Sequence, residues 1–400
     1  MIHIADRLNR IKPSPSSMAG QRVRELRAAG RDVLGLTAGE PDFDTPLHIR
    51  QAAQRAMEAG KTKYTDVGGT PELKAAIRDK FARENGLHYE TSEIIACTGA
   101  KQAIFNALMC TVEHGAEVII PAPCWVSYPD IVRLAGGSPV LVPCDAASGF
   151  KLTPDQLERA ITPRTRWLLL NSPNNPSGAV ITRDEMRALA DVLLRHPHVC
   201  ILADDIYEHL VYDDREFVTP AQVEPRLRDR TLTVNGVSKA YAMTGWRIGY
   251  AAGPAALIKN MVKLQSQSTS NPSSISQAAA VAALNGPQDF IPETRAVFQR
   301  RRDLVVELLN QAPGVRCHRP EGAFYLFASC EGAIGKKSPR GSTIATDMDF
   351  TLHLLDAANI AVIQGDAYGL SPFFRISFAD SEERLREGCR RIRLACEELA

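Results

Sequence analysis

From about residue 93 onward, short runs rich in apolar residues alternate with amphipathic stretches. Strand-like runs lie at 94–98, 117–120, 139–143, 167–171, 200–203, 231–235 and 246–253. Stretches with apolar residues three and four positions apart lie at 101–112, 127–134 and 183–195, and these indicate helices. Strands that alternate with helices across short connections predict an α/β fold with a mostly parallel sheet and helices on both faces.

The pattern changes near residue 289. An Arg-rich helical stretch at 290–311 precedes strand-like runs at 322–327 and 374–378 and a closing helix at 381–399, with an exposed loop expected at 338–343. We therefore expect a large domain over 46–288 and a smaller α+β domain over 289–400. Residues 1–45 are expected to form an N-terminal arm and to contribute to the smaller domain.

Composition narrows the function. The 400 residues are 44% hydrophobic and 23% charged, with a net charge of +1, which is typical of a globular enzyme and does not favour nucleic-acid binding. No apolar stretch is long enough to span a membrane, and the N-terminal segment lacks the apolar run of a signal peptide. The nine cysteines form no CxxC pair, so we expect reduced thiols, no metal site and a cytoplasmic location.

Lys239 is the most informative residue. It follows the strand predicted at 231–235, with Ser238 before it and Arg247 eight residues later. A lysine in this position can form a Schiff base with an aldehyde, while the serine and the arginine hold an anion nearby. Taken alone, a lysine is more often a solvated surface group.

Other candidate residues follow neighbouring strands, where sheets of this kind bind ligands. Gly99 and Ala100 open a helix, whose free N–H groups form an anion site. Asn175 lies in a turn-rich loop that could equally be a plain surface loop, and Asp204 could equally be a helix cap. Arg375, flanked by apolar residues, is either an ion-paired strand arginine or a carboxylate clamp.

These motifs resemble, in order and over essentially the whole chain, those of class I aminotransferases. The stretch Val-Asn-Gly-Val-Ser-Lys-Ala-Tyr-Ala-Met-Thr-Gly-Trp-Arg at 234–247 matches the lysine signature of that family. The resemblance implies fold type I, with a seven-stranded sheet and a smaller domain, and pyridoxal 5′-phosphate as the cofactor. It also implies a homodimer with shared active sites, because Tyr64 matches a tyrosine that reaches the phosphate of the neighbouring subunit.

The resemblance further implies a role for each residue at the cofactor. Lys239 is the covalent anchor and the general base and acid, and Asp204, rather than the competing Asp205, contacts the pyridine nitrogen. Tyr207 and Asn175 contact the cofactor O3′. The remaining cofactor contacts are the phosphate ligands Gly99, Ala100, Ser238 and Arg247, and the stacking residue Trp125, beside which Cys124 replaces a larger residue.

The substrate contacts place the chain closest to the bacterial aspartate aminotransferase branch, which includes aspartate/prephenate aminotransferases. Gly39, Asn175 and Arg375 are implied to meet the α-carboxylate, and Lys101, with Ser16 beside it, the side-chain carboxylate. The expected reaction transfers an amino group between aspartate or glutamate and 2-oxoglutarate or oxaloacetate. Prephenate, aromatic or alanine donors remain alternatives, as does a pyridoxal-phosphate C–S lyase, whereas the sensor domain of a transcription regulator would need an added DNA-binding segment.

Overall fold

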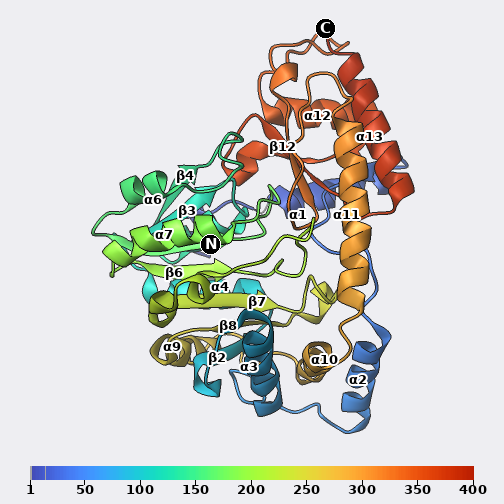
Figure 1. The fold of residues 1–400 in the computed structure, drawn as a ribbon. Helices are drawn as coiled ribbons and strands as arrows, with labels where there is room; N and C mark the ends of the chain where they lie inside the picture. The colour runs from blue at the N-terminus through green and yellow to red at the C-terminus, as the bar shows by residue number, and fades with distance from the viewer. Residues whose placement is uncertain (1, 14) are drawn as a thin grey trace.

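A seven-stranded sheet forms the larger part of the molecule. The computed structural model describes residues 2–13 and 15–400, without the side chain of Ser16 (Figure 1). The sheet order is β2-β8-β7-β6-β5-β3-β4, in which only β8 runs antiparallel to its neighbours. The predicted α/β fold with a mostly parallel, seven-stranded sheet is therefore confirmed. The strands are β2 (Ile94–Cys97), β3 (Glu117–Ala122), β4 (Ser138–Pro143), β5 (Thr165–Asn171), β6 (Cys200–Asp204), β7 (Thr231–Gly236) and β8 (Gly249–Ala252).

Both faces of this sheet are buried, which explains why its strands are apolar at consecutive positions. In β2, Ile95 and Cys97 pack with α4 and α9 on one face, whereas Ile94 and Ala96 pack with α3 and α10 on the other. The helices around the sheet are α2 (Leu47–Glu58), α3 (Pro71–Asn85), α4 (Ala100–Thr111), α5 (Ser127–Leu134), α6 (Pro154–Ala160), α7 (Arg183–Arg195), α8 (Pro220–Val223), α9 (Ala255–Ser266) and α10 (Ser274–Asn285).

A second, smaller set of strands lies at the top of Figure 1. An antiparallel sheet has the order β11-β12-β9, and a separate parallel pair joins β1 to β10. These strands are β1 (Leu34–Gly35), β9 (Tyr325–Ser329), β10 (Ile360–Ala361), β11 (Ile363–Gln364) and β12 (Phe373–Ser377), and the helices around them are α1 (Pro15–Ala28), α11 (Phe290–Leu309), α12 (Asp347–Ala358) and α13 (Glu382–Glu397). The domain boundaries at 45/46 and 288/289 stay a prediction.

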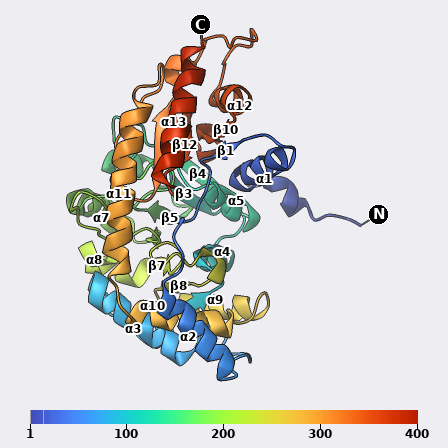
Figure 2. The same ribbon diagram turned by 90° about the vertical axis from the view of Figure 1, so that its right-hand side faces the viewer.

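The long helix α11 connects the two regions. Figures 1 and 2 show it running from the level of α10 up to α13 along the outside of the molecule. Phe298 and Val305 of this helix are buried in the same core as Phe324 and Phe378. Within the described part of the chain, no helix is both long and apolar enough to cross a membrane.

Two predicted strands start too early. The strand predicted from 246 begins at Gly249, because Thr244–Trp246 forms a 3₁₀ turn and Arg247 adopts φ 56°. The strand predicted from 322 begins at Tyr325, since Ala323 has φ 56°. Both errors come from backbone turns at residues other than glycine, which an apolar pattern does not reveal. The loop expected at 338–343 is a mostly exposed turn.

Candidate active site

A cavity of about 350 Å³ lies at the carboxyl ends of β5, β6 and β7, a size within the ~300–1,000 Å³ usual for small-molecule pockets. Its wall contains most of the residues that the sequence singled out: Gly39, Ala100, Lys101, Trp125, Asn175, Asp204, Tyr207, Ser238, Lys239, Arg247 and Arg375. They come from loops and strand ends far apart in the chain, and the fold brings them to one place, as expected for the strand ends of a parallel sheet.

Lys239 lies three residues beyond the end of β7, and its amine points into the cavity. The Nζ atom donates to the backbone oxygen of Gly39 at 2.5 Å and lies 5.8 Å from the ring centre of Tyr207. Burial lowers the pKa of this amine to about 8, although the charge of Glu40 acts to raise it. An amine that is easily freed of its proton is suited to attack a carbonyl carbon and to accept a proton from a substrate.

Asp204 ends β6 and is 4% exposed. Its Oδ2 atom accepts a hydrogen bond from the Tyr128 hydroxyl at 2.5 Å, whereas Oδ1 has no hydrogen-bond partner among the described residues. Burial raises the pKa of this carboxyl to about 6, and the bond from Tyr128 opposes the rise. A buried oxygen without a donor is costly, so it marks the place of a donor that the ligand would supply.

Asp205 differs from its neighbour. It does not belong to the cavity wall, and its backbone N–H bonds to Val234 of β7. Burial, reinforced by the charges of Glu208 and Asp204, raises the pKa of Asp205 well above its usual value. Because Asp205 lies outside the cavity wall and burial disfavours its charged form, it is not placed to provide a charge to a ligand there.

An anion cradle lies where α4 begins. As the first residues of the helix, Ala100 and Lys101 have backbone N–H groups with no acceptor inside it. Gly99 has φ 82°, and a Cβ atom there would collide with the guanidinium of Arg247. Glycine is therefore required for this arginine to approach the helix. Ser238 lies in the same wall, and no described carboxylate forms an ion pair with Arg247, so the positive charge is left for a bound anion.

Arg375 of β12 is 2% exposed, yet no carboxylate in the described chain pairs with it. It donates to Asn175 Oδ1 at 3.1 Å and to the backbone oxygen of Thr37 at 2.8 Å, and its guanidinium lies 4.4 Å from the ring centre of Tyr325. Its Nε has no hydrogen-bond partner among the residues that the structure describes. Because a buried charge without a counter-ion is unfavourable, this arginine indicates a site for an anionic ligand.

Lys101 is a further cation in the wall. Its Nζ atom lies 4.7 Å from the ring centre of Trp125. Burial, together with the nearby charge of Arg247, lowers the pKa of this amine. Gly39 contributes its backbone to the wall, but a Cβ atom there would meet only the Tyr325 hydroxyl, at an ordinary 3.6 Å. The described atoms alone therefore do not require glycine at this position.

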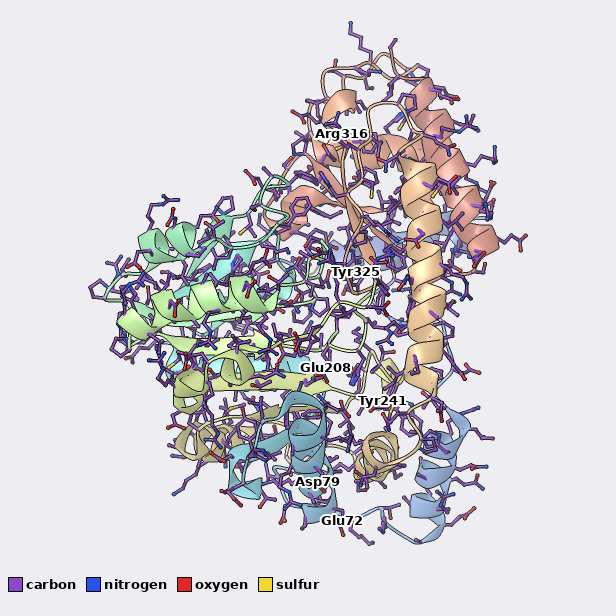
Figure 3. The ribbon with its side chains drawn as sticks, in the orientation of Figure 1. Glu72, Asp79, Glu208, Tyr241, Arg316 and Tyr325 are labelled. Carbon is purple, nitrogen blue, oxygen red and sulfur yellow. The ribbon has the colours of Figure 1, made fainter. Side chains whose placement is uncertain are left out.

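Two predicted residues are not part of the wall: Gly99, which directly precedes Ala100, and Tyr64, which is 91% exposed. The side chain of Ser16 lies outside the described residues. Conversely, the sequence did not single out Tyr128, which holds Asp204, or Tyr325, whose hydroxyl lies 2.9 Å from that of Tyr207. Tyr325 is at the end of the upper sheet nearest the lower one (Figure 3), in a strand whose apolar pattern gives no sign of a polar contact.

The wall fits pyridoxal 5′-phosphate. Lys239 supplies an amine for the aldehyde, and the unpartnered Asp204 Oδ1 suits a protonated ring nitrogen. The cradle at Gly99 and Arg247 suits the phosphate, and the Trp125 ring offers a surface for stacking.

Comparisons with known proteins agree with this fit. Residues 31–392 match the family model "Aminotransferase class I and II". The aspartate aminotransferase of Rhizobium meliloti (strain 1021) is 60% identical, covering 99% of this chain and 97% of that protein. The aspartate/prephenate aminotransferase of Cereibacter sphaeroides is also 60% identical, covering 99% of both chains.

Solved structures give the same result. The crystal structure of the Rhizobium meliloti aspartate aminotransferase superposes with a TM-score of 0.98 at 60% identity, covering 100% of both chains. The Thermus thermophilus aspartate aminotransferase with maleate superposes with a TM-score of 0.92 at 42% identity, covering 99% of this chain and 100% of that one. This chain therefore belongs to the class I and II aminotransferases, a family of pyridoxal-phosphate enzymes.

Proposed function

We propose that this protein transfers an amino group between an acidic amino acid, aspartate or glutamate, and a 2-oxo acid, 2-oxoglutarate or oxaloacetate. The observation that carries the proposal is the pair of cations Arg375 and Lys101, which face one cavity without a described carboxylate partner. Two such cations match the two carboxylates of an acidic substrate. The names of the relatives, aspartate and aspartate/prephenate aminotransferases, support the same substrate class.

When bound, pyridoxal phosphate supplies an aldehyde carbon that accepts amino groups and a ring that takes up electrons from the substrate. Lys239 would hold the cofactor through its Nζ atom. Once free, its amine would act as the base for the proton on the substrate Cα and then as the acid that gives this proton back. Its lowered pKa, about 8, favours the neutral amine that this step needs.

The other residues position the reactants. Asp204 would keep the proton on the ring nitrogen through Oδ1, while Tyr128 fixes the orientation of the carboxylate. Asn175 and Tyr207 would hydrogen-bond the phenolic oxygen of the ring. Arg375, which bonds to Asn175, would receive the α-carboxylate of the substrate. These contacts hold the substrate Cα within reach of the Lys239 amine.

A donor panel tests this proposal. The purified protein with pyridoxal phosphate is given aspartate, glutamate, alanine or phenylalanine, each with 2-oxoglutarate, oxaloacetate or prephenate as acceptor. We expect glutamate and oxaloacetate to form in equal amounts from aspartate and 2-oxoglutarate. Release of ammonia or CO₂ without an added 2-oxo acid would instead favour a lyase or a decarboxylase. Prephenate is included because one relative carries it in its name.

We further propose a homodimer in which the exposed Tyr64 reaches the phosphate of the other subunit. Its 91% exposure leaves the phenol free to do so. Light scattering tests the dimer, and Tyr64→Phe should weaken cofactor binding without dissociating the dimer.

The cysteines of the described chain are all free, which supports a compartment that keeps thiols reduced, such as the cytoplasm.

A further inference from the structure

A segment without helix or strand, residues 37–45, crosses the cavity and contacts two of its cations. We call it the strap. The backbone oxygen of Thr37 accepts from Arg375 at 2.8 Å, and that of Gly39 accepts from Lys239 at 2.5 Å. The strap thus contacts both the substrate clamp and the reacting amine, and Arg375 also bonds to Asn175.

The strap is attached to the long helix α11 by one ion pair and by the ring of Phe43, whose centre lies 6.2 and 5.3 Å from the ring centres of Phe290 and Phe298. Both oxygens of Asp42 bond to the guanidinium of Arg301, at 2.7 and 2.9 Å. Arg301 is 8% exposed, and its guanidinium lies 5.3 Å from the ring centre of Phe43. Within the described residues this is the only ion pair of the strap, and its bidentate geometry in a mostly buried place makes it stronger than a surface pair.

Hydrogen bonds attach the strap on the other side. The hydroxyl of Thr45 donates to the backbone oxygen of Ala242 at 2.6 Å, and that of Thr244 donates to Glu40 at 2.7 Å. The turn at 242–244 follows Lys239 closely in the chain. The strap therefore bridges the turn after the reactive lysine and a helix that also packs in the core of the upper sheet (Figure 1).

We propose that Asp42 and Arg301 form a positioning pair for the substrate site: their ion pair fixes the strap so that Thr37 orients Arg375 and Gly39 holds the Lys239 amine when this amine is free. Only two residues separate Gly39 from Asp42, so a shift of Asp42 is transmitted to the Gly39 backbone. A displacement of about 1 Å in a positioning group can cost up to ~100-fold in rate. The inference rests on the proposed transamination, but it concerns residues outside the cavity wall.

The neighbouring residue of the same helix provides a matched control. Arg302 forms a bidentate pair with Asp213, at 2.7 and 2.8 Å, and is itself 0% exposed. Asp213 belongs neither to the strap nor to the cavity wall. The variants Asp42→Asn and Asp213→Asn therefore each remove a bidentate Asp–Arg pair from the same helix, and only the first one loosens the strap. Arg302 also bonds to Asp303, at 2.9 Å, whereas Arg301 has no second carboxylate partner among the described residues.

The test compares the holoenzyme of wild type, Asp42→Asn and Asp213→Asn in three measurements. These are kcat and KM for aspartate and for alanine with saturating 2-oxoglutarate, the Kd of the non-reacting dicarboxylate maleate by calorimetry, and the Tm. We expect Asp42→Asn to raise KM about tenfold for both donors and to weaken maleate binding by a similar factor. Asp213→Asn should lower the Tm at least as much and leave KM and the maleate Kd unchanged.

The proposal is overturned if Asp42→Asn binds maleate and both donors as the wild type does, or if Asp213→Asn raises KM equally, which would show a general loss of stability. If Asp42→Asn does not fold, Arg301→Lys is measured in its place. A higher KM in Arg301→Lys would support the proposal, and a KM equal to that of the wild type would contradict it. If the wild type shows no transamination at all, the proposed function fails, while the maleate comparison still tests the ion pair.

Discussion

Replacing Lys101 tests the acidic-substrate proposal most directly. The Lys101 ammonium lies over Trp125 and near Arg247, with no described carboxylate beside it. Lys101→Met removes the charge but keeps an unbranched stem to pack on the indole ring. The variant therefore separates the loss of the cation from the loss of packing, which Lys101→Ala would combine.

The size of the effect follows from the environment. A hydrogen bond to a charged group contributes about 1.5–3 kcal/mol, and removing one partner of a desolvated charge pair costs about 2–5 kcal/mol. Because Lys101 is exposed as a residue although burial lowers its pKa, the lower part of this range applies. We expect a loss of about 2–3 kcal/mol for aspartate, which is about 30- to 150-fold in kcat/KM.

The assay is the ratio of kcat/KM for aspartate to that for alanine. Alanine carries no side-chain carboxylate and should be nearly unaffected, so the ratio should fall by the full factor in Lys101→Met and in Lys101→Ala. Equal losses for both donors would refute the reasoning. Lys101 would then serve the cofactor phosphate or the fold, and the acidic substrate would lose half of its structural support.

Three further predictions concern the cofactor. Lys239→Ala should abolish turnover and the borohydride-reducible cofactor linkage, and a linkage that persists would assign the anchor elsewhere. Asp204→Asn should lower kcat by about 100-fold or more, because an amide cannot hold the ring nitrogen protonated. Asp205→Asn should have little effect on kcat, because Asp205 lies outside the cavity. If Asp205→Asn has the lower kcat instead, the roles assigned to the two residues are exchanged. Cofactor affinity should fall as the pH drops through the Asp204 pKa of about 6, because the protonated carboxyl has no charge to offer the ring nitrogen. The bond from the Tyr128 hydroxyl favours the ionised carboxylate and lowers this pKa. In a binding titration, Tyr128→Phe should therefore move the loss of affinity to higher pH.

The sequence could predict the parts of the fold that depend on local pattern. Buried strands such as β5 and β6 are apolar at consecutive positions, and α7 shows both a helical period and a capping box at Thr182. Residues at the ends of these strands are brought together by the topology of a parallel sheet. Asn175 and Asp204 could therefore be placed in one site before their contacts were known.

The rest of the site depends on contacts between distant parts of the chain, which leave no local pattern. Tyr128 and Asp204 are 76 residues apart, and Asp42 and Arg301 are 259 apart. In the sequence, Tyr128, Asp42 and Arg301 look like ordinary residues of an amphipathic helix or of a loop. The selection between Asp204 and Asp205 is the clearest case. Both are buried acids, and each has one carboxylate oxygen without a hydrogen-bond partner among the described residues, but the fold turns only Asp204 into the cavity. A reactive site in this protein is thus defined less by which charged residues are present than by which of them the fold turns into the cavity.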